Sequence, residues 1–257
     1  MAELVIGTKI AELVASVLLN KGAQTASKFF HGKFKRGISS LRGFEEGDTC
    51  IVLSSLYPTS MDKAIFKPET IEGTEVRGMA VQSPVPVTGI RDSFGLARLA
   101  AELVKSEINF ELRIDPISAQ EKTKNLILFG SPSSNLVARE FYQKYLPPTA
   151  NFKYDLSYGI MMFEGTSYGA NFQSGHLGVA LKYRNPWNEK SQILWLAGIG
   201  PVGTEAAVFF VTQEFDTDIV PRSIKESPYW IALIEGKTSS DYAYVIESGY
   251  RGGKPLV

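Results

Sequence analysis

Two loops, one rich in serine and one rich in glycine, contain the residues whose types and spacing best suit ligand chemistry. The first, Gly130-Ser-Pro-Ser-Ser-Asn135, follows the apolar run Asn125–Phe129 and precedes a helical pattern that begins at Leu136. At a helix start the main-chain N–H groups lack partners and the helix dipole is positive, so small side chains and hydroxyls there suit phosphate or carboxylate. We therefore predict an anionic ligand in contact with Gly130, Ser131, Ser133, Ser134 and Asn135.

The second loop follows the apolar run Gln192–Ala197. Gly198, Gly200 and Gly203 have the G-x-G-x-x-G spacing, directly after a predicted strand and directly before a helix predicted to start at Thr204. In a dinucleotide-binding turn such glycines permit a tight turn, close approach of the main chain to a pyrophosphate, and close packing of the helix. We predict that the ligand also contacts Gly198, Gly200, Gly203 and Thr204.

The late position of this second loop leaves a structural alternative open. A dinucleotide motif normally occupies the first strand–helix turn of its domain, with an acidic residue about 20 residues later at the end of the next strand. Here Asp216 and Asp218 follow in a predicted loop. The glycines could therefore serve only a tight turn. The sequence requires no cofactor, and NADH or NADPH is the lesser alternative.

Four further residues are candidates for the same site. Arg91 and Asp92 lie in the loop 88–93, and Asp92 is the predicted N-cap of the helix that follows. Glu205 at a helix start and His176 in a glycine-rich stretch are candidate catalytic acids or bases. Each of the two also has a structural explanation, because an acid favours the helix dipole and a histidine can be held in a hairpin by hydrogen bonds.

These residues require a scaffold of alternating strands and helices. Continuous apolar runs at Thr49–Leu56, Asn125–Phe129 and Gln192–Ala197 predict strands buried on both faces, and apolar stripes at helical spacing lie between them. The alternation predicts a Rossmann-like α/β domain with a mainly parallel sheet and helices on both faces. Tyr229–Ile234 and Tyr242–Glu247 predict a late antiparallel edge hairpin. Ligands of such sheets bind beyond the carboxyl ends of the strands, where the three loops would meet.

Two other parts of this body have weaker patterns. Tyr158–Phe163 and Leu177–Tyr183 flank a glycine-rich connection and predict a pair of neighbouring strands. Residues 57–90 are rich in Pro, Gly and Thr, which predicts a long excursion with a short strand at Arg77–Val81. The sequence leaves open whether this excursion closes over the site.

The N-terminal part differs from the rest in charge. Apolar residues at helical spacing predict a helix from about Glu3 to Asn20, and a basic stretch, Ser27–Arg36, follows it. Residues 1–42 carry a net charge of +5 and residues 43–257 carry −5, which predicts a basic helical segment attached to one α/β domain. We favour packing of this segment on its own domain. The alternatives are a protein partner, a homo-oligomer, or a membrane surface.

Composition excludes several classes of protein. The 257 residues have a formal net charge of zero, which argues against extended nucleic-acid binding, and no apolar run is long enough to span a membrane. Cys50, the one cysteine, opens a predicted buried strand and is expected to be inert. With two well-separated histidines it does not make a zinc site. The N-terminal charge follows the apolar stretch, so no export signal is indicated and a cytoplasmic location is predicted.

The two loops also carry a family resemblance. Leu126–Glu140 and Ile193–Ala207 resemble the loops of an uncharacterised prokaryotic family of Rossmann-like domains, some with S-layer-type labels, in which "G-G-P-x-x-N-P" and "A-G-x-x-G-x-G-T-x-A-A" recur. The family's "D-Y-G-L/I" strand and "N-P-(F/W)-N" turn match Ser157–Ile160 and Asn185–Asn188. The resemblance covers roughly residues 88–250 and implies the fold and both loops, without a reaction.

The second loop is also similar to the "P-G-G-x-G-T-x-x-E" motif of the lysine-decarboxylase-like phosphoribohydrolases. Gly203-Thr204 matches that motif, but Glu205 follows at once instead of two residues later. A shift of two helical positions turns a side chain by about 200°, so the catalytic role of the family's glutamate does not carry over directly to Glu205.

Three hypotheses for function follow. The first is a binding or sensing domain for a nucleotide or another phosphorylated metabolite, with the N-terminal helical part in contact with a partner. The second is a hydrolase that cleaves an N-glycosidic or phosphate bond of a nucleotide, with Glu205 or His176 as acid or base. The third is a structural module that oligomerises through residues 1–42.

Overall fold

The computed structural model describes residues 38–54, 70–71, 74–75, 90–132, 134–155, 160–169, 176–238 and 245–256. The predicted N-terminal helix, the basic stretch, the strand at Arg77–Val81, Ser133 and most of the Ser157–Ile160 motif lie outside these residues. Two short strands, β2 (Thr70–Ile71) and β3 (Thr74–Glu75), pair with each other within the excursion.

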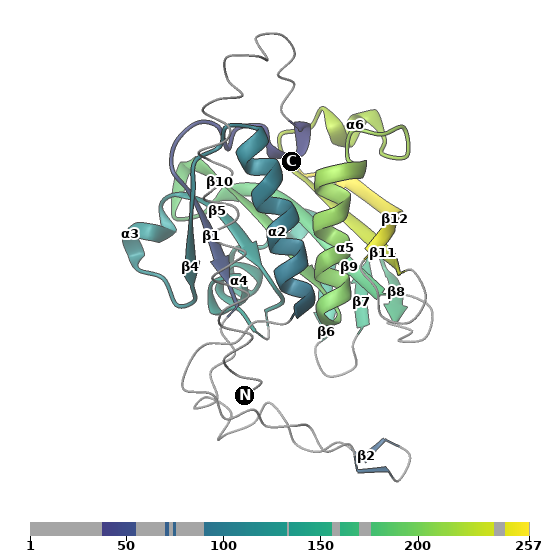
Figure 1. Ribbon diagram of the computed structural model, residues 1–257. Coiled ribbons are helices and arrows are strands. Elements are labelled where there is room, and N and C mark those ends of the chain that lie inside the picture. Colours follow the sequence, from purple (N-terminus) through teal and green to yellow (C-terminus); the bar gives the residue numbers. More distant parts are fainter. Residues whose placement is uncertain are drawn as a thin grey trace.

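A seven-stranded sheet forms the centre of the fold, in the order β12-β11-β9-β10-β5-β1-β4 (Figure 1). Its strands are β1 (Thr49–Leu53), β4 (Phe110–Ile114), β5 (Asn125–Phe129), β9 (His176–Asn185), β10 (Asn188–Gly198), β11 (Trp230–Thr238) and β12 (Val245–Pro255). The neighbours β4, β1, β5 and β10 are parallel, and β9, β11 and β12 join by antiparallel pairings. Five strands thus point one way and two the other, with the hairpin β11–β12 at an edge, as the sequence predicts.

Burial on both faces explains the continuous apolar runs of the central strands. All five residues of β5 are buried, as are the first four of β1. Alternate residues face different cores: Ile127 and Phe129 lie in one hydrophobic cluster, whereas Leu126 and Leu128 lie in the other. A strand covered on both sides has no polar face, so period-two alternation is absent from its sequence.

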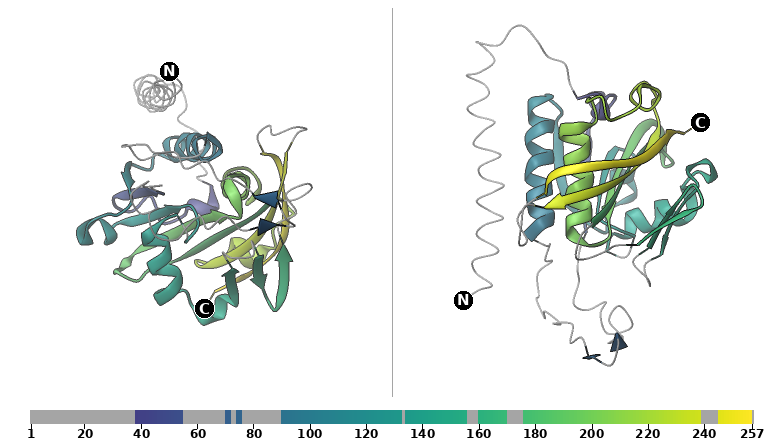
Figure 2. Two further views of the ribbon diagram at one scale, coloured as in Figure 1. Left: turned by 90° about the horizontal axis from the view of Figure 1, so that it is seen from below. Right: turned by 90° about the vertical axis from the view of Figure 1, so that its right-hand side faces the viewer.

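Helices cover both faces of the sheet, as predicted. On one face α2 (Ile90–Lys105) lies beside α5 (Gly200–Phe209), which continues as a π-helical turn, Phe210–Glu214 (Figure 1). On the other face lies α4 (Leu136–Glu140), which continues as a π-helical turn, Phe141–Tyr145 (Figure 2). The short helices are α3 (Ala119–Lys122) and α6 (Arg222–Lys225), with 3-10 turns at Ser39–Leu41 and Pro148–Ala150.

A second, three-stranded sheet corrects one expectation. It consists of β6 (Phe152–Asp155), β7 (Ile160–Phe163) and β8 (Thr166–Gly169), and its Phe152, Met161 and Phe163 pack in the same cluster as α4. The strands predicted as neighbours at Tyr158–Phe163 and Leu177–Tyr183 are therefore in different sheets. The second of them, β9, pairs with β10 and β11 instead. The turn predicted at Asn185–Asn188 is confirmed, because it joins β9 to β10.

Two helices begin earlier than the sequence predicts. α2 begins at Ile90, so Asp92 lies in its first turn and is not its N-cap. α5 begins at Gly200 instead of Thr204, with Pro201 in its first turn. Proline suits the first turn of a helix because its missing N–H would have no partner there and its fixed φ is helical. None of the helices in the described ranges is long and apolar enough to cross a membrane.

The segment that precedes β1 is part of the core. Leu41 and Phe44 are buried in the cluster beneath α2 and α5, and the Ser40 hydroxyl donates to the Val211 carbonyl at 2.7 Å. The buried ammonium of Lys182 in β9 donates to the Arg42 carbonyl at 2.5 Å. Residues 38–42, which the charge pattern groups with the N-terminal segment, thus pack on the α/β body.

Candidate functional site

The strand register brings the predicted loops to one edge of the sheet. Leu53 at the end of β1 lies opposite Phe129 at the end of β5, and Phe129 lies opposite Leu196 of β10. The residues that follow, Ser54 and Gly130, therefore leave the sheet side by side. Because β1, β5 and β10 are parallel, their carboxyl ends and the loops after them share this carboxyl edge.

The connections diverge between β1 and β5. The chain that leaves β1 returns through α2, on one face of the sheet, to β4. The chain that leaves β5 enters α4 on the opposite face, and continues toward the β10 side of the sheet. Where neighbouring parallel strands send their connections to opposite faces, a crevice opens beyond the carboxyl ends, and open α/β sheets bind ligands there.

Three serine hydroxyls meet at this point. The Ser54 hydroxyl donates to the Phe129 carbonyl at 2.9 Å, and the Ser134 hydroxyl donates to Ser54 Oγ at 3.1 Å. Ser131 Oγ lies 3.5 Å from Ser134 Oγ. Gly130, at φ +113°, is required beside them, because a Cβ there would lie 2.0 Å from Ser54 Oγ. The loop Gly130–Asn135 therefore presents hydroxyls that are already linked into one network.

Tyr154 of β6 joins this network to the second glycine loop. Its phenol donates to the Gly198 carbonyl at 2.5 Å. Burial raises the pKa of Tyr154 well above its usual range, and a hydrogen bond with Ser131 opposes that rise. The phenol thus stays protonated at neutral pH and acts as a donor. The structure brings Ser131 and Gly198 to the same side chain, so the two predicted loops meet.

The N-terminus of α4 is filled by the protein's own groups. The side-chain oxygen of Asn135 accepts from the Ala138 N–H at 2.9 Å, and Asp115 Oδ2 accepts from the Leu136 N–H at 2.6 Å. Asn135 is fully buried, and its amide also donates to the Val52 and Phe129 carbonyls. An anion at this helix start would have to displace Asp115.

Asp115 adds a buried carboxyl to the same edge. It follows β4 directly, its N–H donates to the Leu53 carbonyl at 3.1 Å, and its side chain is buried. Burial raises the pKa of Asp115, whereas the N–H groups of Leu136 and Val137 oppose the rise. Burial and the raised pKa make Asp115 a candidate proton donor or acceptor at this edge.

The glycines of the second loop have a packing role. A Cβ at Gly203 would lie 2.0 Å from the Leu177 carbonyl oxygen, and one at Gly198 would lie 2.2 Å from Gly203. A Cβ at Gly178 of β9 would lie 2.3 Å from the Gly203 carbonyl oxygen of α5. The first turn of α5 therefore lies directly on β9 and β10. Its N-cap residue is Ile199, whose side chain has no hydrogen-bonding group and so makes no cap at the start of α5.

The remaining predicted residues lie around this edge at different depths. Thr204 and Glu205 are buried within α5, and the Cα of Glu205 lies beside Gly95 of α2. His176 begins β9 opposite Gly236 of β11. Three strand spacings separate β9 from β1, or about 14 Å. Gly200, like Arg91 and Asp92 in α2, lies in the first turn of a helix that starts at the carboxyl edge.

Sequence reasoning missed three residues of this edge. Ser54 follows β1, but the apolar run continues to Leu56 and places the strand end too late. Asp115 could have been found as an acidic residue directly before Pro116 at a strand end. No local signal points to Tyr154, because it comes from the second sheet. No cluster of His, Cys, Asp or Glu in the described ranges could hold a metal ion.

Comparisons with known proteins assign no family. A scan of the chain against protein-family models gave no match. A search of curated proteins found no similar sequence.

Proposed function

We propose that this chain binds a small phosphorylated ligand of the nucleotide class beyond the carboxyl ends of β1 and β5. The observation that carries the proposal is the divergence of the connections after these strands, with Ser54, Ser131 and Ser134 at the point of divergence. Hydroxyls can donate to phosphate oxygens and can also accept from ribose hydroxyls. The same proposal includes a Rossmann-like fold for the domain that contains these strands.

The start of α5 is the second element of the proposed site. Its N-cap residue, Ile199, makes no side-chain cap, and its first turn is placed at the carboxyl edge by close packing on Gly178 and Gly198. A helix start presents N–H groups and a partial positive charge, which favours a phosphate. The Tyr154 phenol, which contacts both Gly198 and Ser131, would fix the spacing between this helix start and the serine loop.

Calorimetric titration with AMP, ATP, NAD and inorganic phosphate tests the proposal. We expect saturable binding of at least one nucleotide, and binding weakened at least about ten-fold by Ser54→Ala with Ser131→Ala, since a hydrogen bond to a charged group contributes about 1.5–3 kcal/mol. Ser191→Ala is the matched control, because its hydroxyl also donates to a carbonyl, that of Thr123 at 2.9 Å, but at the opposite edge. No binding by wild type, or equal binding by the double variant, would overturn the proposal.

Native mass spectrometry of the purified chain gives an independent test. A nucleotide retained through purification would appear as a mass above that of the 28.3 kDa polypeptide.

A hydrolase is the second candidate function, and Asp115 is the observation that favours it. A buried carboxyl with a raised pKa, at the same edge as the serine network, would supply a general acid or base for cleavage of an N-glycosidic or phosphate bond. Release of base or phosphate from a bound nucleotide should then be lost in Asp115→Asn while binding persists. Glu205→Gln and His176→Gln test the two catalytic residues that the sequence predicts.

A further inference from the structure

The edge strand β4 is self-complementary in charge. Its residues Phe110–Ile114 read Phe-Glu-Leu-Arg-Ile, so that Glu111 and Arg113 flank Leu112 symmetrically. β4 ends the seven-stranded sheet, and β1 is the strand that pairs with it among the described residues. An edge strand with main-chain groups on its outer side is a surface on which another strand can pair.

The pairing with β1 fixes which residues point outward. Leu53 lies opposite Ile114 in the parallel ladder, and its carbonyl accepts from the Asp115 N–H. Parallel pairing uses alternate residues of a strand, so the main-chain groups of Arg113 and Asp115 point toward β1. Those of Leu112 and Ile114 therefore point away from the sheet.

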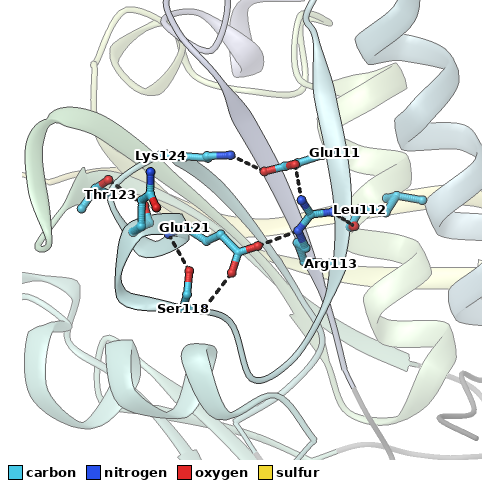
Figure 3. A network of polar contacts seen from close by, with 8 residues as sticks. Glu111, Leu112, Arg113, Ser118, Glu121, Thr123 and Lys124 are labelled. Carbon is cyan, nitrogen blue, oxygen red and sulfur yellow. Dashed lines mark hydrogen bonds and ion pairs between the residues drawn. The ribbon is translucent and has the colours of Figure 1, made fainter.

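The charged side chains form one network on the face opposite α2 (Figure 3). Arg113 bonds Glu111 Oε2 and Glu121 Oε1, each at 2.6 Å, and Lys124 contacts the other oxygen of Glu111. Arg113 is 44% exposed, and its Nη1 donates to the outward carbonyl of Leu112 at 3.2 Å. The Arg113 guanidinium thus occupies the outward carbonyl of Leu112. A main-chain N–H of another strand can replace this hydrogen bond.

We propose that two copies of this chain pair through antiparallel β4 strands, with Leu112 opposite Leu112 on a two-fold axis. The outward groups of the two leucines then exchange both main-chain hydrogen bonds. Glu111 of each copy lies opposite Arg113 of the other, in the close pair whose Cα atoms are about 4.5 Å apart. Ile114, which is 45% exposed in one copy, gains Phe110 of the second copy as its cross-strand neighbour.

This pairing produces one sheet with seven strands from each copy. The contact is isologous, since the same residues serve both sides of the axis. The Arg113 Nη1 donor that leaves Leu112 then bonds Glu111 of the second copy, which adds ion pairs across the interface to those within each copy. The interface does not use residues 1–42, and it lies at the far edge of the sheet from the hairpin β11–β12.

Sedimentation analysis of the full chain over a concentration series tests the proposal. Wild type should form a dimer. Glu111→Arg and Arg113→Glu should each create two pairs of like charges across the interface and weaken dimerisation by about ten-fold or more. An equimolar mixture of the two variants should form a dimer with one copy of each, because both cross-strand pairs are then opposite in sign. Association restored by mixing cannot come from misfolded variants.

The control is Arg222→Glu, which reverses a charge of the exposed Arg222–Glu226 ion pair on α6 and should leave the dimer unchanged. A wild type that stays monomeric throughout the series would overturn the proposal. So would single variants that associate as strongly as wild type, which would point to another surface, or a mixture that stays monomeric.

Discussion

The side-chain amide of Asn135 donates a hydrogen bond of 3.0 Å to the main-chain carbonyl of Val52. The same side chain caps the Ala138 N–H, and it therefore ties the end of β1 to the start of α4. We expect Asn135→Ala to lower the free energy of unfolding by about 3 kcal/mol, because it removes a cap and leaves buried carbonyls without a donor.

Urea unfolding at neutral pH measures this loss. Asn188→Ala is the comparison, since Asn188 also donates to the Thr123 carbonyl and to Ser191 Oγ, but in the more exposed hairpin between β9 and β10. Its loss should stay below about 1 kcal/mol, because water replaces hydrogen bonds at an exposed site. Equal losses in the two variants would contradict the structural role assigned to Asn135.

Close packing makes Gly203 intolerant of even one methyl group. A Cβ at this position would lie 2.0 Å from the Leu177 carbonyl oxygen, so α5 must move away from β9. We expect Gly203→Ala to cost about 3 kcal/mol in unfolding free energy, or to prevent folding. Gly169→Ala in β8 meets no atom within 4 Å and should change stability by no more than about 0.5 kcal/mol. Thermal unfolding of both variants checks the contrast.

Lys182 should make stability depend on pH in the alkaline range. Burial lowers the pKa of Lys182 to about 8 from an unperturbed value of 10.5, while Glu45 opposes that shift. Between these values the unfolded chain binds more protons than the folded one, so the Lys182 contribution to stability rises with pH. Below about pH 8 the Lys182 ammonium is charged in both the folded and the unfolded chain. Its burial then lowers stability by an amount that does not change with pH.

Comparison with Lys182→Met isolates this contribution, because the tyrosines and Cys50 titrate alike in both proteins. From pH 8 to 10.5 the wild type should gain stability relative to the variant in urea unfolding. A difference that stays flat over that interval, or one that changes with the opposite sign, would contradict the lowered pKa.

Cys50 should be unreactive while the protein is folded. It is fully buried in β1, and burial, together with Glu111 and Glu121, raises the pKa of its thiol to about 12. The thiolate is the reactive form, so we expect disulfide exchange with an aromatic disulfide reagent at pH 8 to be at least about 100-fold slower than in urea. Lys190→Cys adds an exposed thiol on β10 as a positive control. Rapid reaction of wild type without denaturant would argue against this burial.

Local signals account for the parts of the fold that the sequence predicts correctly. Asn125–Phe129 is apolar without interruption because β5 is buried on both faces, and the helical stripe after Leu136 corresponds to α4 and its continuation. The hairpin turn at Asn185–Asn188 is likewise a property of adjacent residues. Such signals are reliable because each depends on residues close together in the chain.

Long-range contacts account for what the sequence could not determine. Nothing near Tyr154 indicates that its phenol reaches Gly198, and nothing near Asp115 indicates that it fills the start of α4. The pairing of β9 with β11, and the placement of β7 in a second sheet, also join distant segments. These contacts depend on which buried surfaces fit together and not on the period of any one segment.

The sequence by itself therefore determined the α/β class, the buried strands, and the loops at their carboxyl ends. Periodicity and turn chemistry depend on residues that are neighbours in the sequence, so they can be recognised without any tertiary contact. Only the tertiary structure decided what those loops do with their polar groups: Asn135 caps α4 and holds β1, whereas Ser54, Ser131 and Ser134 share one network. The reason is that a hydrogen bond between distant residues exists only once the sheet register has set their separation.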